Sequence, residues 1–391
     1  MKKSLLALAV ASAAFVATSV SATPVYNKDG TSLDIGGRIE AMWMSGGEQA
    51  VAKNDSTIRN RARLNIAGRT QITNGIAGYG FAEWQSQNAG DSAGSGFTDR
   101  DQYVGVDFGR FGKVQAGRYE DPFQYASDVT DHFEEHGCMA LVGDERNSGK
   151  LSYLWSGYGI DAGATIQFAE NSYDSDVIAN KSWSSLAKKA DGKTAGTMNV
   201  NDGFSLYAGY TTPSVVFGPI SIRAAYKYLD GQNDKNNKTT TYTIFNTDMG
   251  SFDHEKTWAA GLSWGTFKKG LYLAVDYTYD KVEFDNEIGN DLTTKAFESI
   301  ISYGFDSGVV LSTGYQWRKQ EIDSTTVKDQ YTDRAGKLVQ FTVAYNINPN
   351  FRVWAEANVD AGSDDGYCLT KVKNGSNDAE NFFDIGARYT F

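Results

Sequence analysis

The sequence predicts an all-β protein, a 16-stranded antiparallel transmembrane β-barrel. Three observations predict this fold class. Apolar and polar residues alternate in short segments along the chain, short turns alternate with long polar stretches, and the composition is rich in Gly and aromatic residues. The chain has 41 Gly, 22 Tyr, 21 Phe and 8 Trp but only 5 Pro. A wall with one lipid-facing side, bordered by aromatic girdles, requires such a composition.

The N-terminus has the layout of a cleavable secretory signal peptide. Two lysines follow Met1, and an apolar run then ends on small residues at Ala22. A basic start, an apolar middle and a small-residue cleavage site are typical of such a signal. We therefore expect removal of residues 1–22 and a single barrel domain over 23–391, with a retained helical anchor as the alternative.

The predicted mature chain is acidic. Removal of Lys2 and Lys3 leaves 35 of the 37 basic residues against 48 acidic ones, a formal charge of −13. This balance argues against a nucleic-acid partner, because phosphate backbones attract basic surfaces.

The first predicted strands show the alternation that a barrel wall needs. In the segment 33–43, one face holds apolar or small residues, namely Leu33, Ile35, Gly37, Ile39, Ala41 and Trp43. The other face holds Asp34, Gly36, Arg38 and Glu40. The next segment places Arg61, Arg63 and Asn65 opposite Ala62, Leu64 and Ile66. An inner face lined with arginine is not a dry core, so we expect it to meet water.

The same period of two continues to the end of the chain. Segments 220–228 and 339–347 repeat it, and the last segment places apolar and polar residues on opposite faces. The apolar ones are Phe383, Ile385, Ala387, Tyr389 and Phe391, and the polar face carries Asp384 and Arg388. A wall between lipid and water explains both faces, whereas a secreted β-sandwich is the weaker alternative.

The connections between strands alternate in length. Tight turns fall near residues 73–75, 109–112, 156–157, 213–218, 268–270, 306–308 and 348–350. Long polar stretches fall near 45–60, 85–99, 119–148, 169–201, 229–254, 283–293, 318–335 and 360–380. Transmembrane barrels have short periplasmic turns and long outer loops, so this asymmetry indicates the same fold.

Several segments resemble the enterobacterial general porins of the OmpF and OmpC type. The resemblance begins at Tyr26–Gly30 and Leu33–Arg38 and continues through Ala62–Leu64, Gly68–Ile72 and Gly78–Gly80 with Glu83. It reaches the terminal Ala387–Phe391, so it spans the predicted mature chain. The resemblance implies a homotrimer in the outer membrane and a third loop that folds into the barrel to narrow the pore.

The resemblance also implies the residues of the constriction. The basic cluster of the family carries over onto Arg38, Arg63, Arg100 and Arg146. Its acidic partners carry over onto Asp131 and Glu135, with Glu134 as the neighbouring candidate. The loop departs from the family, since Glu134-Glu135-His136-Gly137-Cys138 replaces the usual Pro-Glu-Phe-Gly-Gly and the segment before Arg146 is shorter.

A fifth arginine follows from spacing. Arg61 lies two residues from Arg63 and shares its face, so we expect it to enlarge the basic wall, in preference to Arg59.

The loop that is predicted to fold inward carries a metal-like motif. Residues 132–136 read H-x-x-E-H, the pattern of an inverted zinc peptidase. A catalytic zinc also needs a third protein ligand and a helical surround, and the segment lies in a predicted barrel loop. The sequence therefore predicts no cofactor and no resident metal, with adventitious divalent-metal binding as the alternative. His254 is expected in an outer loop.

Two cysteines lie in predicted loops. Cys138 falls in the inward loop and Cys368 in the last long loop. An exported chain passes an oxidising compartment, so we expect these thiols to pair, with two unpaired cysteines as the alternative.

Together these features predict an outer-membrane porin for passive diffusion of ions and small hydrophilic solutes. The negative charge and acidic loops predict weak cation selectivity. Acidic runs such as Asp364-Asp365 could bridge divalent cations to lipopolysaccharide, although a solvated loop is the simpler interpretation. A substrate-selective channel would require an aromatic slide along the lumen. A barrel enzyme or adhesin is less favoured, because no nucleophile–base constellation is found.

Overall fold

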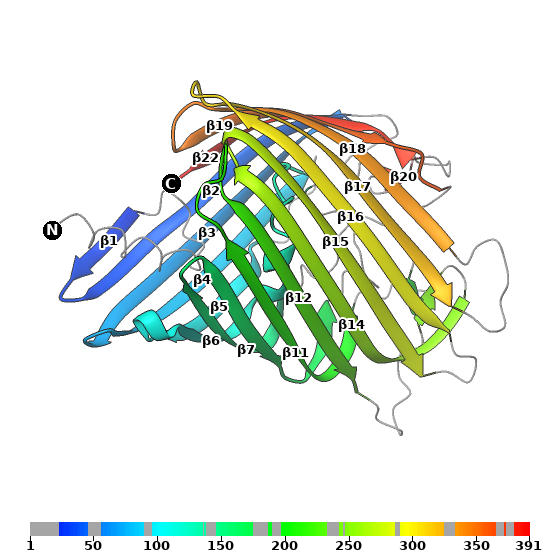
Figure 1. Ribbon diagram of the computed structural model, residues 1–391, viewed down its shortest axis with the longest axis horizontal. Coiled ribbons are helices and arrows are strands. Elements are labelled where there is room, and N and C mark those ends of the chain that lie inside the picture. Colours follow the sequence, from blue (N-terminus) through cyan, green and yellow to red (C-terminus); the bar gives the residue numbers. More distant parts are fainter. Residues whose placement is uncertain are drawn as a thin grey trace.

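The computed structural model describes residues 23–45, 56–89, 96–135, 137, 146–174, 187–189, 197–232, 242–244, 247–285, 290–323, 333–364, 371–372 and 379–391. Within these ranges, sixteen antiparallel strands close into one barrel, as the sequence predicts (Figure 1). The predicted signal peptide, residues 1–22, lies outside the described residues.

The first half of the wall is formed by β2 (Thr31–Ser45), β3 (Ser56–Thr73), β4 (Ile76–Ala89), β5 (Thr98–Asp107), β6 (Lys113–Glu120), β7 (Arg146–Gly157), β8 (Ile160–Gln167) and β11 (Thr197–Thr211). The second half is formed by β12 (Ile220–Gly231), β14 (Thr247–Thr266), β15 (Lys269–Asp285), β16 (Asp291–Gly304), β17 (Val309–Asp323), β18 (Asp333–Asn346), β19 (Phe351–Asp360) and β22 (Phe382–Thr390).

Short elements decorate this wall. They are β1 (Thr23–Lys28), β9 (Glu170–Asp174), β10 (Ala187–Lys189), β13 (Tyr242–Ile244), β20 (Lys371–Val372), β21 (Ala379–Glu380) and the 3₁₀ turns η2 (Gly109–Phe111) and η3 (Pro122–Ala126). β1 pairs with β2, β9 pairs with β11, and β13 pairs with both β10 and β14. None of the described helices is long and apolar enough to span a membrane.

The barrel closes where its first and last wall strands meet. β22 pairs with β2 from Thr390 opposite Arg38 to Phe383 opposite Ser45. Two backbone hydrogen bonds extend this seam: Gly37 N donates to Phe391 O at 2.9 Å, and Phe391 N donates to Gly37 O at 3.0 Å. Closure satisfies the backbone groups that an open sheet edge would leave unpaired in lipid.

Along each strand the apolar side chains are exposed and the polar side chains are buried, which is the reverse of the pattern in a soluble protein. Large apolar side chains face outward, and Ile222 and Ile385 are 61% and 59% exposed. Charged side chains of adjacent registers face inward, and Glu40 and Asp384 are 1% and 0% exposed. The outer surface therefore suits hydrocarbon, and the polar groups gather in the interior.

The strands of the second half extend further than the sequence predicts. β14 has 20 residues and β15 has 17, more than the roughly 9–11 that a tilted strand needs to cross a membrane. The predicted loop 229–254 is strand at both of its ends, over residues 229–231 and 247–254, and His254 lies on β14 rather than in a loop. The inward apolar side chains of this extension include Leu229, Phe252 and Phe284, which share one buried cluster.

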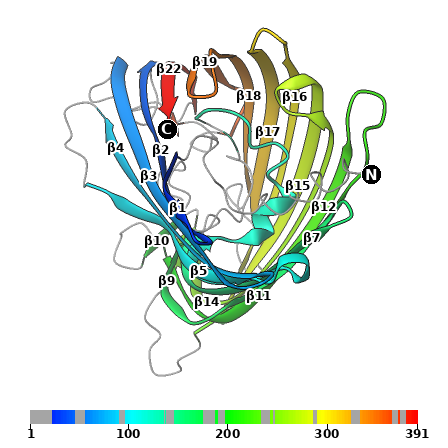
Figure 2. The same ribbon diagram turned by 90° about the vertical axis from the view of Figure 1, so that its left-hand side faces the viewer.

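The segment that follows β6 enters the barrel. We call the described residues Asp121–Glu135 the inward loop. Figure 2 shows its helical turn η3 inside the ring of strands. This placement narrows the interior and brings the loop to strands far away in sequence.

Candidate functional site

The inward loop begins with a turn that its own sequence favours. Pro122 occupies the first position of η3, and the Asp121 carboxylate accepts a hydrogen bond from Phe123 N at 2.9 Å. Ser205 on β11 donates from Oγ to the same carboxylate at 2.6 Å. Phe123 is fully buried against the wall. The start of the loop is thereby fixed to the inner surface.

The middle of the loop packs on β15 and β16. Val129 and Phe133 share an apolar cluster with Tyr272, and the Tyr272 hydroxyl donates to Val129 O at 2.6 Å. Thr130 Oγ1 donates to the Asp276 carboxylate and lies 3.3 Å from Glu298 Oε2. Apolar packing and hydrogen bonds together fix this part of the loop.

His132 takes part in the same packing. Its ring stacks on Phe267 with centroids 3.9 Å apart and an interplanar angle of 7°, and it meets Tyr272 edge-on. Burial, with a further contribution from the charge of Lys268, lowers the pKa of His132 to about 4. The imidazole is therefore neutral at pH 7.

The tip of the loop is held by ion pairs. Glu134 lies 2.7 Å from Arg352 on β19 and 2.8 Å from Arg388 on β22. Glu135 pairs with Arg59 and with Arg61, the latter at 2.8 Å, both on β3. We call these six residues the tip network. Because both glutamate side chains are about 5% exposed or less, the four arginines neutralise charges that have lost most of their water.

Two wall glutamates support the tip network. Glu356 accepts hydrogen bonds from the backbone N of Glu134 at 2.8 Å and of Glu135 at 3.3 Å. Glu40 pairs with Arg61 and Arg388, and also with Arg38 at 2.9 Å. Glu40 is thus the shared partner of three arginines from three adjacent strands.

A second basic group lies on β2, β3, β5 and β7. We call Arg38, Arg63, Arg100 and Arg146 the wall row. Arg63 Nε donates to Gln85 at 2.7 Å, and its guanidinium lies 4.0 Å from Glu83. Arg100 pairs with Glu83 at 2.7 Å. Arg146 lies 2.7 Å from Glu120 and 3.3 Å from Asp101. The side chains of these four arginines are 18–23% exposed, so they retain partial contact with the lumen.

The predicted constriction residues fall into two places. Arg61 joins Glu134 and Glu135 in the tip network, whereas Arg38, Arg63, Arg100 and Arg146 form the wall row. Asp131 is exposed inside the barrel, and its carboxylate fills the space that a Cβ on Gly137 would need. The sequence favours Arg61 over Arg59, but in the structure both contact Glu135.

Sequence reasoning missed four members of the site: Arg352, Arg388, Glu40 and Glu356. A signal was available for Arg388 and Glu40, since both lie on the polar register of their strands and the first and last strands of a barrel are neighbours. Nothing in the local sequence near Arg352 or Glu356 indicates that a loop more than 200 residues away reaches them.

Some predicted groups are not covered by the structure. His136, Cys138 and Cys368 lie outside the described residues, and with them the second histidine of the zinc-like motif and the expected disulfide. In the part of the chain that the structure describes, no group of three or more His, Cys, Asp or Glu is arranged to hold a metal ion.

The chain as a whole is similar to known proteins. The family model for "Gram-negative porin" matches residues 4–367. Outer membrane protein U of Vibrio vulnificus is 33% identical over 252 residues, covering 60% of this chain and 70% of that protein. Outer membrane porin PhoE of Escherichia coli is 28% identical over 326 residues, covering 81% and 82%.

Solved structures show the same fold. Salmonella typhi OmpF, solved in complex with daunomycin, aligns with a TM-score of 0.68 at 18% identity, covering 94% of this chain and 100% of that one. The trimer form of OmpT from Vibrio cholerae aligns with a TM-score of 0.60 at 16% identity, covering 93% and 100%.

Proposed function

Since this chain belongs to the Gram-negative porin family and is an outer-membrane channel protein rather than an enzyme, we propose that the wall row and the inward loop form the constriction of its pore. Ions and small hydrophilic solutes diffuse through the barrel and pass between these two groups. The observation that carries the proposal is the position of the loop, which is fixed inside the barrel from Asp121 to Glu135.

The charged side chains determine which solutes pass the constriction most readily. Most of the negative charge of Glu134 and Glu135 is compensated by the tip network, so these carboxylates act mainly as anchors. The arginine side chains of the wall row are 18–23% exposed, more than the 8–16% of the tip arginines, and Asp131 is exposed inside the barrel. Dipolar solutes align in the resulting transverse field. Apolar molecules pass the constriction less readily, because they must displace the water that the charges order.

We further propose weak cation selectivity for the whole channel. The predicted mature charge of −13 raises the local cation concentration at the mouth, while the wall row opposes this effect at the narrowest point. A reversal potential of anion sign across a KCl gradient would contradict this proposal.

The decisive experiment replaces one wall arginine. Arg63→Ala removes a positive charge and a bulky side chain from the wall row. The channel should therefore become more cation-selective, with a shifted reversal potential and an altered unitary conductance in planar bilayers. Arg110→Ala is the matched control, because Arg110 lies exposed in the η2 turn outside the lumen.

Identical selectivity in wild type, Arg63→Ala and Arg110→Ala would remove Arg63 from the constriction. Absence of conductance in the wild type would contradict an open channel altogether.

Processing and assembly complete the proposal. Residues 1–22 are removed on export, and the mature chain forms a homotrimer that contacts lipopolysaccharide at its acidic outer loops. Cys138 and Cys368 form a disulfide. The intact mass of purified protein, measured before and after reduction, tests both covalent claims.

A further inference from the structure

Four lysines cross the outer surface of the second half of the wall. The strands β14, β15, β16 and β17, which Figure 1 shows side by side, carry Lys256, Lys281, Lys295 and Lys319 on their outward registers. The residues before and after each lysine face inward and are buried, whereas the lysine side chains are 29–41% exposed. We call these four residues the lysine row.

An outward aromatic ring lies two residues from each lysine, on the side of the tight turns. The four rings are those of Trp258, Tyr279, Phe297 and Trp317. Outward aromatic residues of a barrel form a girdle where the hydrocarbon of the membrane meets the lipid headgroups. The lysine row is therefore the first charged register beyond the hydrocarbon, at the level of the headgroups and toward the extracellular ends of the strands.

The lysines face one another across the strands in two pairs. Lys256 is directly opposite Lys281. Lys295 is directly opposite Lys319. Like charges in directly opposite positions destabilise a sheet. An anion bound between the two lysines of a pair would relieve this repulsion.

Carboxylates near the lysine row lie further out than the lysines. Glu283 is 3.5 Å from both lysines of the first pair, and Glu321 is 2.7 Å from both lysines of the second. One lysine of each pair also meets an aspartate at 2.9 Å, Asp291 or Asp333. All four carboxylates are nearer to the extracellular ends of their strands than the lysines are. A phosphate at the level of the girdle therefore meets ammonium groups before it meets carboxylates.

A groove of about 430 Å³ lies on the outer surface beside the first lysine pair. Its floor contains Ala208, Ala224 and Ala260, which are directly opposite one another on β11, β12 and β14. Trp258 and Tyr279 border the groove, and each lies two residues from a lysine of the first pair. None of the described residues that line the groove is charged. Its shape and chemistry suit a flexible hydrocarbon chain.

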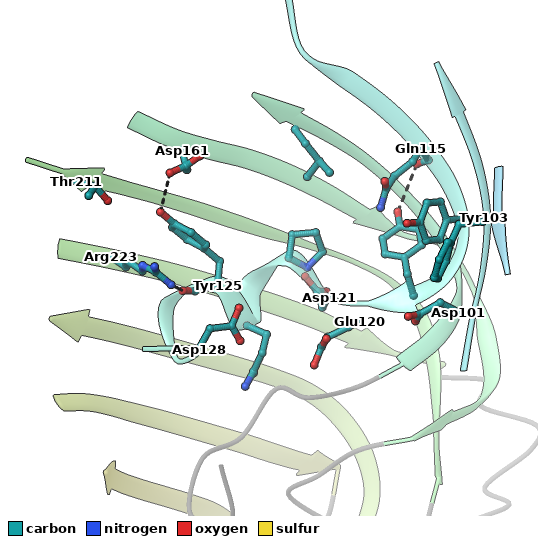
Figure 3. Close-up of a pocket in the computed structure, with 15 residues that line it drawn as sticks. Asp101, Tyr103, Gln115, Glu120, Asp121, Tyr125, Asp128, Asp161, Thr211 and Arg223 are labelled. Carbon is teal, nitrogen blue, oxygen red and sulfur yellow. Dashed lines mark hydrogen bonds between the residues drawn. The ribbon is translucent and has the colours of Figure 1, made fainter. Parts of the chain in front are cut away.

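The groove opens to the membrane and not to the lumen. On the inner side of the same strands, Ala225 and Ala259 pack on Phe123 of the inward loop. Figure 3 shows Arg223 of β12 beside Tyr125 of that loop, and Arg223 Nη1 donates to Tyr125 O at 2.9 Å. The inner face is therefore covered by the protein itself, and only a membrane component reaches the groove.

We propose that the lysine row and the groove together bind the phosphorylated, acylated end of lipopolysaccharide, lipid A. One phosphate contacts Lys256 and Lys281, the other contacts Lys295 and Lys319, and an acyl chain lies in the groove over Ala224. The two pairs are two strands apart with a two-residue offset, which places them roughly 12 Å from each other. This spacing suits a disaccharide with a phosphate at each end. The inference rests on the proposed contact with lipopolysaccharide and gives that contact a defined site on the barrel wall.

The test uses native mass spectrometry of the purified protein in detergent, titrated with bis-phosphorylated lipid A. Wild type should retain one lipid per chain. Lys256→Gln combined with Lys281→Gln should weaken binding about ten-fold, because two unit charges at contact distance are lost. Lys28→Gln combined with Lys269→Gln is the matched control, since both lysines are exposed at the tight-turn end of the barrel.

A second variant tests the groove without changing the charge. Ala224 is exposed on the outer surface, so Ala224→Leu is compatible with the fold. The leucine occupies the space of a few methylene groups of the acyl chain, and binding should weaken about three-fold. Lipid A without phosphates and phosphatidylglycerol, which has one phosphate, should both bind more weakly than bis-phosphorylated lipid A.

The outcomes separate the site from the proposed contact. Lipid A binding that is equal in wild type and in the Lys256→Gln, Lys281→Gln variant would overturn the site and leave a contact at the loops. Equal affinity for phosphatidylglycerol and lipid A would overturn the assignment to lipopolysaccharide. Absence of lipid A binding to wild type would contradict both the contact and the site. None of these measurements requires an open channel.

Discussion

At the scale of single residues, the site depends on arginines that share carboxylates. Glu40 is 1% exposed and pairs with three guanidinium groups, while Glu134 and Glu135 each pair with two. Buried ion pairs are costly to leave incomplete, so removal of one partner destabilises more than the intact pair stabilises. The tip of the inward loop is therefore held by several ion pairs that neutralise one another rather than by any single strong contact.

His132 links the stability of the loop to pH. Its pKa falls from 6.5 to about 4 on folding, chiefly because burial penalises the imidazolium, so the unfolded chain binds more protons between these values. Stability should fall as the pH is lowered from about 6.5 to about 4, by up to roughly 3 kcal/mol at 1.36 kcal/mol per pKa unit. Lys268, Arg223 and Arg352 act in the same direction, since all are positive.

The variant His132→Phe isolates this effect. Phe preserves the stack on Phe267 and removes the titrating group, whereas the carboxylates that titrate in the same range remain. Urea unfolding of both proteins between pH 4 and pH 8 should give a stability difference that grows in favour of the variant as the pH falls. A difference independent of pH would show that His132 does not titrate on unfolding.

At the scale of elements, the seam between β2 and β22 completes the barrel. Gly37 lies at this seam, and an added Cβ would meet Arg63 O and lie 2.9 Å from the Phe391 ring. To make room for this Cβ, the backbone would have to move, and that movement would shift the β2–β3 pairing that positions Arg38 and Arg63. The geometry of the constriction thus depends on a close approach of backbone at one end of the chain.

Gly37→Ala should therefore reduce the yield of folded barrel and lower its resistance to heating in detergent, measured by the shift in gel mobility on unfolding. Gly68→Ala is the matched control, because Gly68 lies on the same β2–β3 ladder and an added Cβ there has no neighbour within 4 Å. Equal behaviour of the two variants would mean that the seam accommodates a methyl group.

At the scale of the whole molecule, the apolar exterior surrounds a charged interior. Outward side chains such as Trp258 and Ile301 are more than half exposed on a single chain, which fits contact with lipid or with a neighbouring copy. The long strands β14 and β15 contribute Phe252 and Phe284 to a buried apolar cluster that also contains Met198 and Val200 of β11.

The proposed homotrimer can be tested directly by two measurements. Light scattering of the protein, corrected for bound detergent, should give three times the chain mass, and bilayer recordings should show openings that close in three steps, one for each barrel. A mass of one chain together with single-step openings would establish a monomeric channel.

The barrel wall can be derived from the residue pattern alone. A period of two with one apolar side allows a strand only one orientation relative to lipid, so the inward registers of Arg38, Arg61, Arg63 and Arg388 follow from counting residues. Turn-forming residues separated the strands, and Asp121-Pro122 determined locally how the inward loop starts. The ends of the strands in the second half were harder to predict. Near these ends apolar side chains also face inward, so the sequence reads like a polar loop that contains a few hydrophobic residues.

The ion-pair partners of the loop tip follow from barrel closure and not from any local sequence pattern. Barrel closure brings β3, β19 and β22 together around Glu134 and Glu135, although Arg388 is 254 residues from Glu134 in sequence. The resemblance implies that Glu135, with Glu134 as the neighbouring candidate, faces the wall row, whereas in the structure Arg352, Arg388, Arg59 and Arg61 neutralise these two carboxylates. Periodicity determines the face on which a side chain lies, whereas the identity of the charge opposite it depends on the path of a loop across a closed lumen.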